Sequence, residues 1–233
     1  MNNQILTMAI LSALAGSSMA GMEDDPILWM TKIDQLEVRV TEGPDPLVLE
    51  GYTWIGKDLN KFWVGFEAEW VDGDTEEAEV ELLYSRAIAP YWDFQLGWRH
   101  DIQPEPNRDW FAIGFKGVAP YFFEMDADLY VGKSGQVNAR LQGEYEIMFT
   151  QKLILTPELE LNLHTRNDEA VGIGSGFSDL EFGLRLRYEI RREFAPYIGV
   201  NWNQKFGNTA DFARNEGEDT NDVQFVVGIR AWF

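Results

Sequence analysis

Apolar and polar side chains alternate one by one along most of the chain. For example, Phe62, Val64 and Phe66 share one parity, whereas Glu67 and Glu69 share the other. A period of two is typical of a β-strand that has one apolar and one polar face. No helical period of about 3.6 residues competes with it over a comparable length. The pattern therefore predicts an all-β fold.

Breaks in this alternation divide the chain into about twelve strands. The predicted strands are residues 32–41, 46–56, 61–71, 76–87, 91–102, 109–117, 121–132, 136–148, 152–165, 178–191, 196–206 and 222–233. Tight turns alternate with longer loops rich in Gly, Asn and Asp, such as residues 71–76, 166–177 and 207–221. This is the layout of an antiparallel up-and-down transmembrane β-barrel of the outer membrane, with both termini at the periplasmic end.

A soluble barrel and a membrane barrel give the same alternation, because they differ only in which face points inward. Three features favour the membrane barrel: strands of about 10 or more residues, an export signal, and aromatic residues near the strand ends. Those aromatic residues are Tyr52, Trp54, Tyr91, Trp92, Trp98, Trp110, Tyr121, Tyr188, Tyr197, Trp202 and Trp232. The prediction is therefore that apolar side chains face lipid and charged side chains line the lumen.

The two ends of the chain support export and membrane insertion. Residues 1–20 have an apolar centre followed by small residues and read as a cleaved signal peptide, although Lys and Arg are missing before the apolar centre. A buried N-terminal helix is the alternative. Residues 21–31 then form a short periplasmic segment, and residues 32–233 form the barrel. The last strand ends in Phe233, which resembles the insertion signal of outer-membrane barrels.

Composition excludes several other classes of protein. The 233 residues carry 39 acidic and 19 basic side chains, a formal net charge of −20, so phosphate backbones would repel the chain and no nucleic-acid partner is expected. Without cysteine there are no disulfides, thiol nucleophiles or Cys-ligated metal sites. Because 14% of the residues are aromatic, the chain has enough apolar surface to fold despite its charge.

The inward parity of the predicted barrel is rich in carboxylates. An acidic lumen of low dielectric attracts cations and repels anions. Many of these carboxylates are expected to pair with Arg and Lys and to stabilise the wall. The predicted acidic lining is Glu67, Glu69, Glu79, Glu81, Asp126, Asp128, Glu144, Glu158 and Glu181.

Few side chains are candidates for metal ligands. His164 has the inward parity, in line with Glu160, and Met148 has the inward parity near a tight turn. Met22 and Met30 precede the first predicted strand, where their thioethers could bind Cu(I) from the periplasm. A lone His is more often a structural hydrogen-bonding group than a ligand.

Catalysis has little support in the sequence. A lipase-like site could be sought in His164 with Ser175 or Ser178, but His164 has the wrong parity for a site that reaches lipid. G-x-S-x-G, phosphate-loop and H-E-x-x-H motifs are all missing from the sequence. We expect a protein that is not an enzyme.

Four segments resemble the copper resistance protein B family of outer-membrane proteins: residues 81–93, 117–124, 183–197 and 228–233. The run Arg-Arg-Glu-Phe-Ala-Pro-Tyr is the most distinctive of them, and the resemblance extends over residues 28–233. It implies a barrel in the outer membrane of a Gram-negative bacterium that binds copper ions and assists their export or sequestration from the periplasm. It also implies a periplasmic multicopper oxidase as a partner, in addition to outer-membrane lipid.

The chain departs from that family before the barrel. Members typically carry a Met- and His-rich segment there, whereas residues 21–31 hold two Met and no His. We therefore expect weaker copper binding than in Met-rich relatives, or delivery of copper by another protein. The alternative from a different class is a general cation-favouring porin without a metal-specific role.

Overall fold

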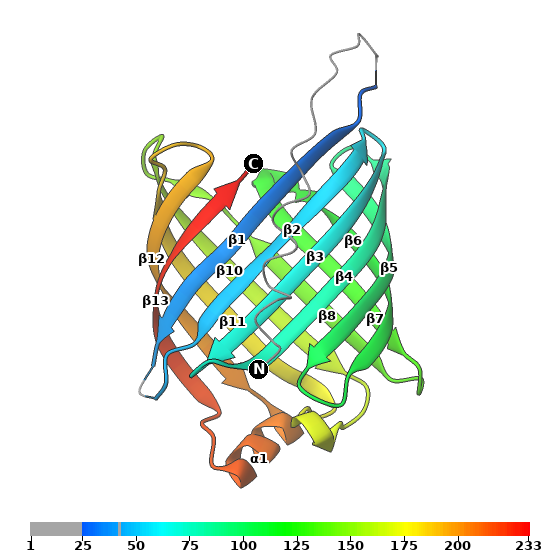
Figure 1. Ribbon diagram of the computed structural model, residues 1–233, viewed down its shortest axis with the longest axis vertical. Coiled ribbons are helices and arrows are strands. Elements are labelled where there is room, and N and C mark those ends of the chain that lie inside the picture. Colours follow the sequence, from blue (N-terminus) through cyan, green and yellow to red (C-terminus); the bar gives the residue numbers. More distant parts are fainter. Residues whose placement is uncertain (1–24, 42) are drawn as a thin grey trace, which may run out of the picture.

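The computed structural model describes residues 25–41 and 43–233, and it forms a closed antiparallel β-barrel (Figure 1). Apart from β8 and β9, which both pair with β10, consecutive strands pair with each other, and β1 pairs with β13 to close the sheet. The predicted signal peptide and Met22 lie outside the described residues. The strands are β1 (Leu28–Val40), β2 (Leu47–Lys57), β3 (Asn60–Val71), β4 (Asp74–Ala89), β5 (Trp92–Gln103), β6 (Arg108–Ala119), β7 (Phe123–Gly132), β8 (Val137–Glu144), β9 (Ile147–Met148), β10 (Leu153–His164), β11 (Gly176–Tyr188), β12 (Phe194–Lys205) and β13 (Asn221–Trp232). The helices are η1 (Pro120–Phe122), η2 (Glu169–Val171) and α1 (Gly207–Glu216).

The barrel wall has twelve strand positions. The sheet contains 13 strands, but β8 and β9 follow each other along the same partner, β10, and together occupy one position as an interrupted strand. The interruption falls at Tyr145 and Glu146, which the sequence prediction had included in a single strand. The predicted twelve-stranded up-and-down barrel is therefore confirmed.

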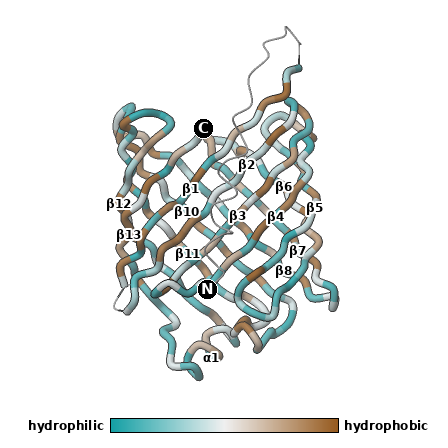
Figure 2. Tube along the Cα trace, viewed as in Figure 1, coloured by the Kyte–Doolittle hydropathy of each residue, from teal (hydrophilic) through white to brown (hydrophobic). Residues whose placement is uncertain are grey.

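The two faces of the barrel are inverted relative to a soluble protein. Phe62 and Ile198 are 64% and 61% exposed, whereas Glu37 and Arg185 are 1% and 6% exposed. Hydrophobic and hydrophilic positions alternate along the strands in Figure 2. A surface of apolar side chains around a charged interior is stable only when lipid covers the outside. The predicted membrane barrel is confirmed by this arrangement.

The start of β1 and the end of β13 lie at the same end of the barrel. The backbone N–H of Thr31 donates to the carbonyl oxygen of Phe233 over 3.1 Å, and the N–H of Phe233 donates to the carbonyl oxygen of Thr31 over 2.8 Å. All five connections at this end are short, and the β10–β11 and β12–β13 connections at the other end are much longer. Since outer-membrane barrels keep their short turns inside the cell envelope, we assign this end, the upper one in Figure 1, to the periplasm.

Two local expectations were wrong, and one long loop contains an element that was not expected. β1 begins at Leu28 rather than at residue 32, so Met30 lies in the barrel wall opposite Trp54. The connection at 71–76 is only the two-residue turn Asp72-Gly73, whose positive φ values of 52° and 89° are those of a tight hairpin turn. The long loop at 207–221 contains α1, which ends at Gly217 in the left-handed conformation. Among the described residues, no helix is long and apolar enough to cross a membrane.

Candidate functional site

The polar faces of the strands enclose two internal cavities, one above the other. The periplasmic cavity, of about 200 Å³, is lined by Lys32, Lys116 and Glu144 among others. The extracellular cavity, of about 370 Å³, is lined by Asp101 and His164 among others. All nine residues of the predicted acidic lining lie on the walls of these cavities: Glu67, Glu69, Glu79, Glu81, Asp126, Asp128, Glu144, Glu158 and Glu181.

Both cavities carry a surplus of negative charge. Ten acidic and six basic side chains line the periplasmic cavity, and twelve acidic and seven basic side chains line the extracellular cavity. Charges of one sign on low-dielectric walls concentrate counter-ions in the space between them. The lumen therefore favours cations along its whole length.

Three carboxylates stand side by side on neighbouring strands near mid-height. Glu50 on β2 is directly opposite Glu67 on β3, which is directly opposite Glu79 on β4. Like charges in directly facing positions destabilise a sheet, and departures from local stability rules concentrate at functional sites. Within the described chain, Glu50 has no ion pair, whereas Glu79 is paired with two arginines. We call Glu50, Glu67 and Glu79 the carboxylate row.

A buried ion cluster lies beside the carboxylate row, around Glu37 on the neighbouring strand β1. Its carboxylate accepts hydrogen bonds from Arg39 Nε (2.9 Å), from Arg185 Nε and Nη2 (both 2.9 Å) and from the Tyr197 hydroxyl (2.8 Å). A register shift between Ile33 and Leu36 precedes this cluster in β1. A bulge of this kind re-aims the side chains that follow it.

Several aromatic residues face the lumen rather than lipid. Trp110 and Tyr197 are both 4% exposed, and Tyr52 lines the periplasmic cavity, so these three of the aromatic residues named near strand ends do not face lipid. Trp110 Nε1 donates to Asp101 Oδ2 over 2.7 Å, and Tyr130 packs under Arg99, 4.7 Å from the ring centroid. Aromatic residues occur on both parities of the strands, so the sequence offered little to separate the lumen-facing aromatic residues from the lipid-facing ones.

His164 lines the extracellular cavity, as its parity predicts. Its Nδ1 atom is buried and has no hydrogen-bond partner in the described structure. Glu160 lies on the same wall, but its oxygens accept hydrogen bonds from Gln142 and Asn162, both over 2.7 Å. Across residues 25–41 and 43–233, no group of three or more His, Asp or Glu side chains is arranged to hold a metal ion.

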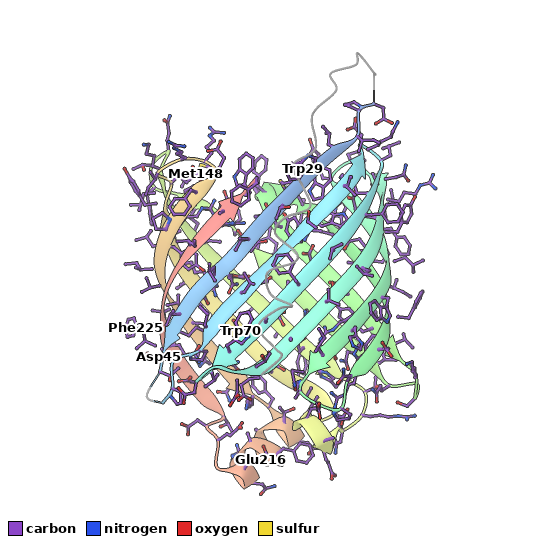
Figure 3. The ribbon with its side chains drawn as sticks, viewed as in Figure 1. Trp29, Asp45, Trp70, Met148, Glu216 and Phe225 are labelled. Atoms are coloured by element: carbon purple, nitrogen blue, oxygen red, sulfur yellow. The ribbon has the colours of Figure 1, made fainter. Side chains whose placement is uncertain are left out.

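The methionine candidates do not join His164. Met148 has the predicted inward parity, since it is directly opposite Ile154, which is 2% exposed, but it lies 67% exposed at the periplasmic rim (Figure 3). It is opposite Ile154 at the start of β10, whereas His164 ends that strand, roughly 33 Å away at the usual rise per residue. Met30 is half-buried near the periplasmic mouth, two positions before Lys32.

The two histidines lie on different faces of the wall. His100 is outside the lumen, stacked on Trp98, and its Nδ1 atom lies 2.9 Å from Asp109 Oδ1. Ser178 is buried, and its Oγ atom accepts a hydrogen bond from Thr209. No hydrogen bond in the described part of the chain joins His164 to a serine. The geometry therefore offers no support for the lipase-like arrangement.

Comparison with known proteins identifies the family. A family model described as copper resistance protein B precursor (CopB) matches residues 27–233. The chain belongs to the copper resistance protein B family. It is 44% identical to copper resistance protein B of Escherichia coli over 212 residues, which are 91% of this chain and 72% of that relative. It is 42% identical over 200 residues to a copper resistance protein B homolog of Pseudomonas syringae pv. tomato, covering 86% of this chain and 68% of that one.

Solved structures agree with the copper resistance protein B assignment at the level of fold. The NanC porin matches with a TM-score of 0.59 at 13% identity, covering 88% of this chain and 99% of the porin. The KdgM porin matches with a TM-score of 0.52 at 12% identity and the same coverage. Outer membrane phospholipase A from Escherichia coli gives 0.50 at 11% identity, over 87% of this chain and 92% of that one. Family and fold together place this copper resistance protein B barrel in the outer membrane and support a role in copper resistance.

Proposed function

We propose that the protein protects the cell by taking copper ions from the periplasm into its lumen and assisting their export or sequestration, without acting as an enzyme. The carboxylate row carries the proposal, because it puts three neighbouring negative charges on the wall of a lumen that already favours cations. A fixed field of this sign attracts copper ions and repels anions. The family to which the chain belongs supports copper as the cation.

Copper survival tests the row directly. A strain that lacks the protein is complemented with the wild type or with the double variant Glu50→Gln, Glu67→Gln, neither of which breaks a short ion pair. The control is Glu105→Gln, Glu216→Gln, two exposed residues outside the strands that remove the same charge. We expect the first variant to approach the copper sensitivity of the deletion strain and the control to retain tolerance. Equal tolerance of the two variants would show that the row is not used.

Candidate ligands for the metal itself lie at both ends of the barrel. We propose Met22 and Met30 as thioether contacts for Cu(I) at the periplasmic mouth, and His164 with Glu160 as contacts at the extracellular cavity. Cu(I) titration of the folded mature protein compares the wild type with the double variant Met22→Ala, Met30→Ala and with His164→Gln. Met148→Ala is the matched control, since Met148 is at the exposed rim. Each variant is expected to lose affinity relative to the control.

A periplasmic multicopper oxidase is the partner that the family resemblance favours, and outer-membrane lipid covers the apolar face. The alternative is a cation-favouring porin without a role in copper tolerance, which the acid surplus of both cavities also supports. Deletion of the protein separates the two proposals. Unchanged periplasmic copper and unchanged survival under copper stress would leave only the porin.

A further inference from the structure

The lumen is divided at mid-height by a narrow polar layer. Eight residues line both cavities and so separate them, and we call this layer the waist. Its only two basic residues are Arg140 and Arg185, as far as the described residues show. The waist consists of Gln35, Glu50, Glu67, Glu79, Tyr130, Arg140, Glu158 and Arg185.

Arg140 spans the bore on one side of the waist. It lies on β8, and its guanidinium donates to both carboxylate oxygens of Glu79 on β4, over 2.9 and 3.3 Å. Strands β5, β6 and β7 separate these two in the sheet, so the contact crosses the lumen and does not run along the wall. A two-point contact between Arg and a carboxylate is among the strongest and most directional polar contacts in proteins.

Arg185 spans the bore on the other side. It lies on β11 and contacts Glu37 on β1, with β12 and β13 between them in the sheet. Its Nη1 donates to Glu158 on the neighbouring strand β10 over 2.7 Å. Gln35 on β1 donates to the same carboxylate over 3.3 Å, which extends this bridge from β10 to β1.

We infer that Arg140 and Arg185 form the constriction of the barrel and determine which ions pass it. Their side chains fill the bore where the two cavities meet, and both guanidinium groups are held there by carboxylates, so a passing ion has to displace these contacts. The four carboxylates of the waist outnumber its two arginines, so Arg140 and Arg185 weaken the preference for cations at this layer without reversing it. The inference rests on the proposed function only in placing the waist on the path of copper, since the barrier acts on any cation.

Single-channel recording in planar lipid bilayers with KCl tests the inference. Arg140→Gln removes the cross-lumen contact and its charge, and we expect conductance to rise roughly tenfold, the factor that corresponds to about 1.4 kcal/mol, with a reversal potential shifted toward K⁺. Arg99→Gln is the matched control: Arg99 also pairs with Glu79, but from the adjacent strand β5, so it does not cross the bore. It is expected to stay within about twofold of the wild type.

The variant Arg140→Lys serves as a second test if the Arg140→Gln protein, which lacks the charge, does not fold. It keeps the charge and loses the two-point contact, so conductance is expected to rise without a change in ion selectivity. Wild-type conductance in both Arg140 variants, or an equal rise in Arg99→Gln, would overturn the inference. Copper survival of the same strains separates the two proposals. A rise in conductance with unchanged copper tolerance would support the constriction and show that copper does not pass through it. Unchanged conductance with altered copper tolerance would contradict the constriction and support the role in copper tolerance.

Discussion

The buried cluster around Glu37 allows a quantitative test of what holds the barrel interior together. Glu37 is 1% exposed and accepts four hydrogen bonds, from Arg39, Arg185 and Tyr197. The substitution Glu37→Gln keeps the shape of the side chain but removes its charge. It also replaces one acceptor oxygen by an NH₂ group that faces the same donors. The two guanidinium groups then remain buried without their shared counter-ion.

The expected cost follows from that geometry. Removing one partner of a buried ion pair typically costs about 3–5 kcal/mol, because the other charge stays buried and unpaired. The remaining contacts of Arg185 with Glu158 and of Arg39 with Glu181 hold the cost toward the lower end of that range. We expect Glu37→Gln to lower the free energy of unfolding by about 3 kcal/mol.

Urea unfolding in lipid vesicles, followed by tryptophan fluorescence, measures this change. Glu124→Gln is the control, since Glu124 is exposed and makes no ion pair among the described residues, and it should stay within about 0.5 kcal/mol of the wild type. In the double variant Glu37→Gln, Arg39→Gln, the cost should be smaller than the sum of the single costs, because one unpaired charge has been removed. A loss below about 1 kcal/mol for Glu37→Gln alone would refute the reasoning.

Further predictions concern the membrane face, a buried hydrogen bond and processing. Leu129→Arg, on the lipid face of β7, should destabilise the folded barrel in vesicles by about 2–4 kcal/mol, whereas Phe122→Arg in the periplasmic turn should cost about 1 kcal/mol or less. Trp110→Phe removes the hydrogen bond to Oδ2 of the buried Asp101, whose Oδ1 atom still accepts from Arg99, and should lower the free energy of unfolding by about 1–3 kcal/mol, again by urea titration. Intact-mass measurement of protein from outer membranes should give a chain that begins after Ala20, and a mass that includes residues 1–20 would contradict cleavage there.

Much of the fold could be predicted because a strand exposes alternate residues to opposite faces. The alternation around Phe62 and Glu67 was enough to predict the strands, and the carboxylates predicted for the lumen all line its cavities. Local turns were less certain, since Asp72-Gly73 forms a tight hairpin where a longer loop was expected. The side to which an aromatic residue points was the hardest feature to predict. Trp110 faces the lumen, although tryptophan is a residue type common at the lipid interface.

The sequence by itself determined that the chain is a barrel of strands and which side chains share a face, because both follow from the period of two along each strand. Only the tertiary structure decided which charges meet across the bore, such as Arg140 with Glu79 and Arg185 with Glu37. These partners lie on strands that are not neighbours. They reach the same level of the barrel only once the number of strands and the stagger between them are fixed by closure of the sheet. A pattern along one strand contains no information about that closure, and for this reason the waist could not be found before the barrel was built.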